Sequence, residues 1–399
     1  MKFVKPSAAP DVNFPPLTLT PVVNSRHAWV ALALHAPAGR EKDCLAALPR
    51  IFGELGLGAA LSELDAIVPL DPSENVGAEL GATLPAAKII LRLPLRQCID
   101  PGQQAGLQLL RQSGFRLMLD GLPPAAPPLA PALTAVASAE MAPLEALSRL
   151  PGPHLACAVD SLDRFELCHR TGYAWFAGDY PLHPRPVQRQ QQGSSRSLLL
   201  RLLAMVTSDA DSRDIEALLK QDPSLSYHLL KLVNSVSFSL TTTITSFSYA
   251  ITLLGRRQLQ RWLQLLLYAQ QRHGDEASPL LARAARRANM MESLCAAVGG
   301  DKEAQEQAFM TGMFSLLDAL FSMPLEKIVT PLHLGDDIEA GLISRGGRLG
   351  RLLFLVEQSE RPATPRLGGE LEALQLAPVD YLRAQIGACA WAIQVSRDA

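Results

Sequence analysis

The chain lacks a charge excess of either sign. Its 37 lysines and arginines nearly balance its 39 aspartates and glutamates, which leaves a formal net charge of −2. Without an overall basic field to attract nucleic acid or an anionic membrane surface, neither is expected as a partner. Two small arginine clusters are expected to be solvated helix faces: Arg283, Arg286 and Arg287, and Arg345, Arg348 and Arg351.

Long apolar runs and closely paired cysteines are also missing. The apolar run at 262–269 is much too short to cross a bilayer. The first residues contain no apolar segment of the kind found in secretion signals. The six cysteines form no Cys-x-x-Cys pair, which is typical of reduced, individually placed thiols. The sequence therefore predicts a cytoplasmic protein.

The two halves of the chain have different patterns. A length of 399 residues favours two domains, and a hydrophobic content of 48% predicts globular ones. Up to about residue 180, β-like runs alternate with helical ones, which predicts an α/β domain with parallel strands. Strands are expected at 29–34, 87–93, 115–119 and 154–159, helices at 45–57 and 103–114, and a Pro-rich loop at 122–131.

The second half is expected to be helical. The polar segment 184–197 has no periodic apolar residue and is predicted to be the interdomain linker. From residue 198 onward the apolar residues follow helical spacing, and no convincing strand is found. The expected domains are therefore 1–183 and 198–399, with the tail at 362–399 packed as a helical extension on the second of them.

Six residues mark the ends of predicted helices in this half: Asp222, Pro223, Asn234, Ser235, Ala250 and Gly255. The Asp-Pro pair suits a helix N-cap followed by proline at the first helical position. The Asn-Ser pair is a plausible helix stop, and the final glycine a C-terminal cap. These residues are expected to be structural. With the sequence between them they resemble the signature of HDOD domains, an all-α family.

HDOD domains are similar to HD-type phosphohydrolases, which hold a metal ion with adjacent His and Asp residues. The matching stretch here is 308–320, with Ser315 at the His position and Leu316 at the Asp position. A leucine has no lone pair for a metal ion, and a neutral serine is a poor ligand. Asp318 is expected to be a polar residue on a helix face. No metal site is therefore predicted in this half.

The first half resembles a degenerate EAL-type domain, the family of cyclic di-GMP phosphodiesterases built on a TIM-like barrel. On this resemblance the positions of three family glutamates are occupied by Ala31, Arg92 and Cys157, an arginine by His35 and a glutamine by Ala177, while Asp120 and Asp160 keep a carboxylate. About 185 residues are available, against roughly 250 in a full barrel, so an incomplete or abbreviated barrel is expected.

The resemblance implies a pseudoenzyme. Cleavage by two metal ions needs several carboxylates, and Asp120 and Asp160 are too few, while Arg92 would bring positive charge to the cation site. The sequence thus predicts no catalytic residue, no metal and no cofactor. The expected function is that of a bacterial signal-transduction adaptor that binds unidentified signalling proteins.

Two alternatives remain open at this point. One is a cyclic di-GMP receptor that does not hydrolyse the nucleotide, with Arg92, Asp120 and Asp160 as a remnant ligand site. The replacements at His35 and Ala177 count against it, and Arg116 together with Arg92 compensates in part. The other alternative is a residual cyclic di-GMP phosphodiesterase. The oligomeric state is left open.

Overall fold

A computed structural model describes residues 14–70, 84–124, 129–183, 278–332 and 334–398, with isolated positions between 201 and 268. The chain divides into two compact units. The first combines Met1–His183 with Glu357–Ile386, and the second combines Pro184–Val356 with Gly387–Ala399. Much of the tail that was expected to pack on the helical half therefore belongs to the first unit.

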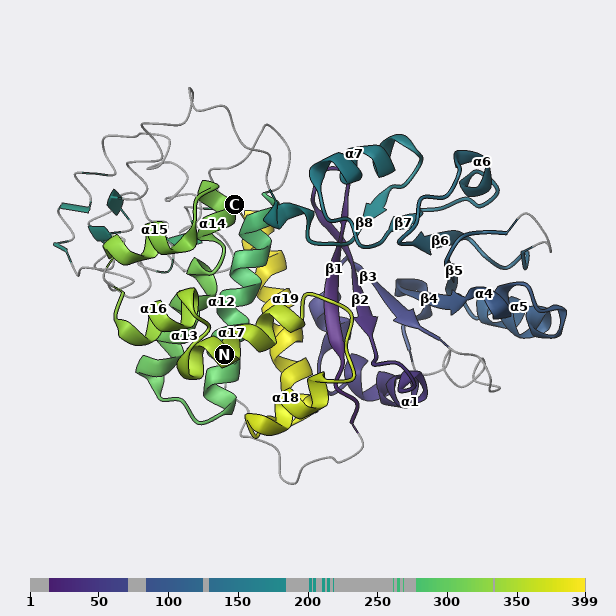
Figure 1. The fold of residues 1–399 in the computed structure, drawn as a ribbon. Coiled ribbons are helices and arrows are strands. Elements are labelled where there is room, and N and C mark those ends of the chain that lie inside the picture. The colour runs from purple at the N-terminus through teal and green to yellow at the C-terminus, as the bar shows by residue number, and fades with distance from the viewer. Residues whose placement is uncertain are drawn as a thin grey trace. The chain divides into compact units, whose positions relative to one another are not determined.

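The first unit contains a closed barrel of eight strands in sequential order, and β8 pairs with β1 (Figure 1). The strands are β1 Thr18–Asn24, β2 Trp29–His35, β3 Asp65–Pro69, β4 Ile89–Pro94, β5 Arg116–Asp120, β6 Ala135–Ser138, β7 Leu155–Ala156 and β8 Trp175–Phe176. The predicted TIM-type barrel is confirmed. Of the two expected alternatives, an incomplete or an abbreviated barrel, the structure has the abbreviated one, because short strands and short connecting helices still allow the sheet to close.

Strand β1 runs antiparallel to both of its neighbours, whereas the other pairs are parallel. Most of the segment Thr20–Ser25 belongs to this strand. A turn follows it, and the Asn24 carboxamide holds the turn by accepting hydrogen bonds from the backbone N–H groups of Arg26 and Ala28. Because β1 is reversed, its first residues lie beside the end of β2, where Thr18 pairs with His35.

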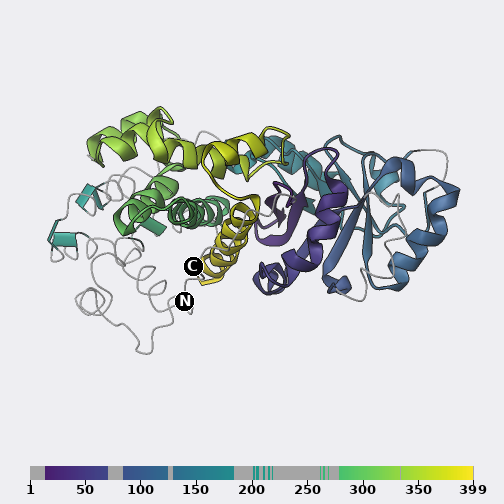
Figure 2. The same cartoon turned by 90° about the horizontal axis from the view of Figure 1, so that it is seen from below.

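Short helices connect the parallel strands and cover the outside of the barrel, as the purple and blue helices in Figure 2 show. They are α1 Glu41–Phe52, α2 Leu57–Leu61, α4 Leu95–Cys98, α5 Gln104–Gln112, α6 Leu144–Leu147 and α7 Leu162–Arg170, with 3₁₀ turns at Ala86–Lys88, Pro101–Gln103 and Tyr180–Leu182. The N-cap of α7 is Ser161, which accepts a hydrogen bond from Arg164 N.

Two C-terminal elements complete the first unit: α18 Leu367–Ala373 and the first part of α19 Pro378–Asp398. The buried Gln385 of α19 binds the backbone of the chain at the start of β1. Its Oε1 accepts from Leu19 N at 2.8 Å, and its Nε2 donates to Leu17 O at 3.0 Å. These bonds satisfy buried backbone groups that the barrel leaves unpaired, which explains why the tail belongs with the barrel.

In the second unit, the described elements are helical, as predicted. They are α12 Pro279–Ala297, α13 Lys302–Phe314, α14 Leu317–Phe321, α15 Leu325–Val329, α16 Asp336–Ile343 and α17 Gly347–Gln358, with a 3₁₀ turn at Thr330–Leu332. Helices α12 and α13 approach closely at Gly312, where a Cβ atom would lie 2.7 Å from Ala288 Cα. Glycine permits this approach because it has no side chain.

Within the described ranges, no individual helix combines the length and apolar character needed to cross a membrane. One pair of segments, Lys302–Phe321 and Leu325–Leu332, meets the length and composition criteria jointly, although a bend of 111° separates them.

Candidate functional site

The carboxyl ends of the barrel strands carry several of the polar side chains that the sequence singled out. Side chains alternate between the two sides of a strand, so the inward-facing set continues from the apolar core to the rim of the barrel. On β4 this set runs from Ile90 to Arg92, and on β5 from Met118 to Asp120. Strand β2 ends at His35 on the same rim. Barrels of this type place their functional groups at this end.

Arg92 and Asp120 form an ion pair at the rim. Arg92 Nη2 donates to Asp120 Oδ1 over 2.6 Å, and the two side chains are 22% and 43% exposed. Arg92 Nε is buried and has no hydrogen-bond acceptor among the residues that the structure describes. A buried donor without an acceptor is unfavourable. The guanidinium therefore has one N–H that the described residues leave without an acceptor.

His35 lies at the same rim, and its Nε2 is 2.8 Å from Thr20 Oγ1. Burial lowers the pKa of His35 to about 3, and the positive charge of Arg92 adds to this effect. Burial also raises the pKa of the Cys157 thiol, an effect that Arg92 opposes and Asp120 reinforces. His35 and Cys157 are therefore neutral near pH 7, and the charge among these side chains resides on Arg92 and Asp120.

The sequence gave no reason to include Thr20 in this group. Its hydroxyl reaches His35 because β1 is antiparallel to β2, which brings an early residue of β1 to the carboxyl end of the neighbouring strand. Nothing in the composition of the segment indicates that direction.

The structure does not bring Asp160 to the ion pair. Asp160 follows β7 in an exposed loop, and its Oδ1 accepts a hydrogen bond from Ser161 Oγ at 3.2 Å. Within the described ranges, no hydrogen bond or ion pair links it to Arg92 or Asp120. Two of the three residues expected to form a remnant site are thus neighbours, and the assignment of a ligand to them stays a prediction.

Two other positions named from the sequence lie away from the rim. Ala31 is completely buried in the apolar core of the barrel. Arg116 begins β5, at the opposite end of the barrel from Arg92, and its Nη2 donates to Asp65 Oδ1 over 2.5 Å. Arg116 therefore cannot support Arg92 in binding one phosphate, contrary to the expectation that the two would compensate together.

The donors at the rim do not fit a pair of divalent cations. In the part of the chain that the structure describes, no three His, Cys, Asp or Glu side chains gather as metal ligands. The carboxylate of Asp120 already faces the guanidinium of Arg92. Two-metal phosphodiester cleavage draws on several carboxylates. We therefore derive no chemical step through a bound metal.

In the helical unit, Arg287 contacts one of the two positions that the resemblance to HD-type phosphohydrolases assigns to metal ligands. Ser315 and Leu316 are buried. Arg287 Nη1 donates to Ser315 Oγ at 3.0 Å, and this hydroxyl donates to Gly312 O at 2.7 Å. Asp318 is exposed, as expected, and accepts a hydrogen bond from its neighbour Ala319 N. The guanidinium places a positive charge where the resembling phosphohydrolases hold a cation.

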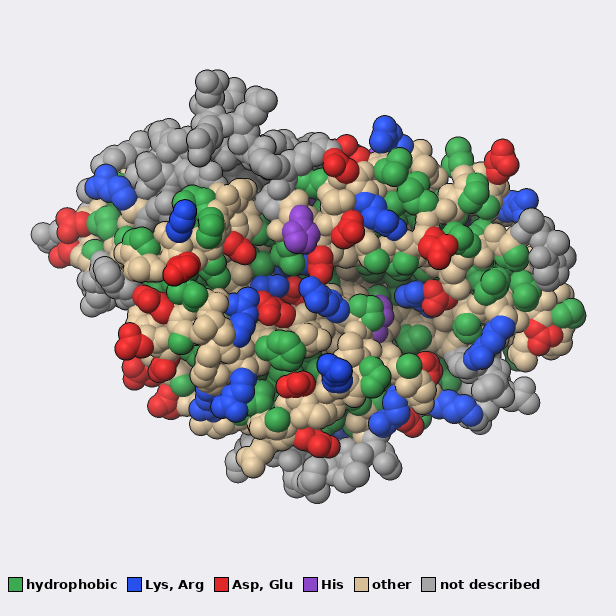
Figure 3. Space-filling view, in the orientation of Figure 1, with side chains coloured by type: hydrophobic (Ala, Val, Ile, Leu, Met, Phe, Trp, Pro, Cys, Tyr) green, Lys and Arg blue, Asp and Glu red, His purple; other side chains and the backbone are tan. Residues whose placement is uncertain are grey.

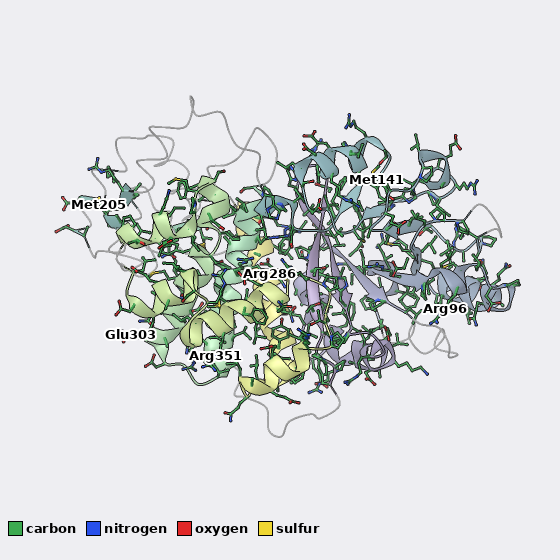
Figure 4. All side chains as sticks on the ribbon, viewed as in Figure 1. Arg96, Met141, Met205, Arg286, Glu303 and Arg351 are labelled. Carbon is green, nitrogen blue, oxygen red and sulfur yellow. The ribbon has the colours of Figure 1, made fainter. Side chains whose placement is uncertain are left out.

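The prediction that the α12 arginines form a solvated face is wrong. Arg283, Arg286 and Arg287 are 8%, 1% and 4% exposed, and Arg286 is labelled inside the unit in Figure 4. Their partners come from distant segments: Arg287 binds Ser315, and Arg286 forms a hydrogen bond with the side chain of Cys389. Helix α12 is surrounded by other helices, so its polar stripe faces the interior.

The six residues of the HDOD signature lie outside the described residues: Asp222, Pro223, Asn234, Ser235, Ala250 and Gly255. Their expected structural role stays a prediction.

Comparison with known proteins identifies the second half directly. Residues 195–323 match the HDOD domain, so the chain carries this domain, as predicted. The chain is 32% identical over 210 residues to the cyclic di-GMP phosphodiesterase CdgJ of Vibrio cholerae, which covers 52% of this chain and 48% of that protein. It is 25% identical over 224 residues to the uncharacterized protein YuxH of Bacillus subtilis, covering 55% and 54%. The chain thus spans about half the length of these relatives.

Solved structures of a protein in complex with cyclic di-GMP and of a phosphohydrolase are also similar. Klebsiella pneumoniae BlrP1, in a complex with manganese and cyclic di-GMP, matches with a TM-score of 0.35 and 15% identity, covering 44% of this chain and 57% of that one. A putative phosphohydrolase from Shewanella amazonensis matches with a TM-score of 0.37 and 14% identity, covering 51% and 93%. Because these TM-scores are low, the identification of the barrel fold rests on its strand order and not on these matches.

These comparisons confirm the resemblance to EAL–HDOD proteins and correct one prediction. The replacements at Ala31, Arg92, Cys157, Ser315 and Leu316 led to the prediction that the chain is not an enzyme. The homology to a protein named as a cyclic di-GMP phosphodiesterase contradicts it. The prediction rested only on the replaced catalytic positions of the family. The similarity of the two sequences over half the chain points to an enzyme instead.

Proposed function

We propose that the protein acts in cyclic di-GMP signalling and binds the nucleotide at the carboxyl rim of its barrel through Arg92. The observation that carries the proposal is the guanidinium at this rim, which is paired with Asp120 on one side. Its buried Nε–H has no acceptor within the described residues. Guanidinium donors match phosphate oxygens in charge and geometry. The homology to a cyclic di-GMP phosphodiesterase supplies the ligand class.

The rim can exchange its internal ion pair for a ligand contact at modest cost. The Asp120 side chain is 43% exposed, so water can solvate its carboxylate when a phosphate takes up part of the guanidinium. His35 is neutral near pH 7 because its pKa is lowered to about 3, and it leaves Arg92 as the positive charge beside the phosphate. During cleavage the same guanidinium would stabilise the negative charge that grows on the phosphate oxygens.

Calorimetric titration of the full chain with cyclic di-GMP tests the proposal, with product analysis of the same samples. We expect saturable heat, and stabilisation against thermal unfolding by roughly 2.7 kcal/mol at a hundredfold excess over the dissociation constant. A linear dinucleotide among the products would extend the proposal to hydrolysis. The absence of both heat and thermal stabilisation would refute nucleotide binding.

The predicted regulatory role of the helical half belongs to the same proposal. An unidentified signalling protein would bind this half, and its binding would depend on whether the barrel holds the nucleotide. Among the described residues of this half, the exposed large apolar side chains are Met323 at 38%, Ile343 at 43% and Phe354 at 39%. Large exposed apolar groups are natural anchors for a partner, so substitution of each by Asp is expected to lower the recovery of that partner in pull-downs.

A further inference from the structure

The connection between β5 and β6 is rich in proline. In a TIM barrel each strand is followed by a helix. Here β5 ends at Asp120 and β6 begins at Ala135, and the described residues between them form no helix. Five prolines fall within 122–131. Proline lacks the N–H group that a helix needs and disfavours helical backbone in the residue before it.

A cavity of about 460 Å³ lies beside this connection. Its walls come from the end of α5 at Arg111, from Leu129, Pro131 and Leu133 of the connection, and from Arg149 and Leu150 after α6. The cavity is therefore lined by the end of α5, by described residues of the connection between β5 and β6, and by the residues that follow α6. Its volume falls in the range of small-molecule sites.

The cavity is separate from the rim that carries Arg92. Arg111 precedes β5, Leu133 precedes β6 and Leu150 precedes β7, so most of the lining lies towards the amino ends of these strands; Pro124, which follows the end of β5, is the exception. The nucleotide proposed above would bind at their carboxyl ends. The two sites can therefore be tested independently.

The charged groups that line the cavity are both positive. Arg111 Nη1 donates to Pro131 O at 2.9 Å, which occupies one of the five N–H donors of a guanidinium. Arg149 forms no hydrogen bond or ion pair with any residue that the structure describes. No acidic side chain is among the residues that line the cavity, and its remaining walls are leucine, proline and alanine.

We propose that this cavity binds a small carboxylate with an aliphatic body. A carboxylate would accept charge-assisted hydrogen bonds from Arg111 and Arg149 and relieve the repulsion between them. The aliphatic part would cover the partly exposed Leu129 and Leu150, which a polar anion such as phosphate would leave in water. A neutral alcohol of the same length would gain the apolar contact and lose the charged one.

Octanoate and octan-1-ol are the probes that separate these contributions, because they differ in the head group and share most of the aliphatic chain. Calorimetric titration of the full-length protein at pH 7.5 is expected to show octanoate binding at least about tenfold more tightly than octan-1-ol. Arg111→Gln and Arg149→Gln are each expected to weaken octanoate binding by about tenfold and to leave octan-1-ol binding unchanged.

Arg96→Gln is the matched control. Arg96, labelled in Figure 4, lies on α4 and is not among the cavity residues, so this variant removes the same charge elsewhere on the barrel. It should bind octanoate like the unmodified protein. Arg149→Gln keeps the test valid if Arg111→Gln unfolds, since Arg149 forms no hydrogen bond or ion pair with the described residues that the substitution would remove. Equal affinity for both probes, or equal octanoate affinity in the Arg96 and Arg149 variants, would overturn the proposal.

Discussion

Protonation of His35 should make the barrel sensitive to acid. Burial and the charge of Arg92 hold the pKa of this imidazole at about 3, against 6.5 for an ordinary histidine. The unfolded chain therefore binds a proton at His35 at a pH where the folded protein does not. Stability is lost as the pH falls through 6.5, and the loss is complete near pH 3. Between pH 7 and pH 5, linkage gives a loss of about 2 kcal/mol from this group alone.

The His35→Gln variant isolates this contribution. Glutamine cannot be protonated in this range and can keep a hydrogen bond to the Thr20 hydroxyl. Free energies of unfolding from urea titrations at pH 7, 6 and 5 should fall about 2 kcal/mol further in the unmodified protein than in the variant. The other buried histidine with a lowered pKa, His154, is present in both proteins and cancels. Parallel pH profiles would show that folded His35 takes up a proton and would refute the reasoning.

Three further changes test the packing by urea unfolding. Gly312→Ala should destabilise the helical unit by about 1–3 kcal/mol, because its Cβ would lie 2.7 Å from Ala288 Cα. Gly387→Ala is its matched control in a helix with open space at the Cβ position, and should stabilise by about 0.5–1 kcal/mol; equal effects of the two alanines would contradict the close approach. Gln385→Leu should cost about 2–4 kcal/mol, because it removes the buried hydrogen bonds to Leu19 N and Leu17 O; an unchanged midpoint would show that these two bonds do not stabilise the fold.

The barrel was partly visible in the sequence. Strands β2, β4 and β5 could be predicted because they are continuous apolar runs, as expected for parallel strands buried on both faces. Strand β6 is a short segment of small residues and β8 has two residues, so neither presents a strand pattern. Strand β1 contains Pro21, which favours a turn in the sequence, although its barrel register places that proline opposite Leu32.

The contacts in the candidate site depend on the register and direction of the strands, and neither can be read from the sequence. Arg92 and Asp120 were both named, but their contact follows from the pairing of β4 with β5. Arg116 was grouped with Arg92 although it lies at the other end of the same strand pair.

The buried arginines of α12 were missed for a related reason. Their helical spacing is the same for a solvated face as for a buried one, and their partners Ser315 and Cys389 are remote in the sequence. Figure 3 shows charged side chains of both signs interspersed on one face of the molecule. Composition alone therefore gave no basis for deciding which arginines are buried.

The dissociation constant of cyclic di-GMP for Arg92→Met and Arg116→Met, each compared with the unmodified protein, tests the central claim most directly. Both arginines are paired with an aspartate and lie on adjacent barrel strands, at opposite ends. Methionine keeps much of the side-chain volume and removes the charge. If the rim binds the phosphate, the Arg92 variant should bind at least about tenfold more weakly, and the Arg116 variant like the unmodified protein. Equal affinities in all three proteins would contradict the account.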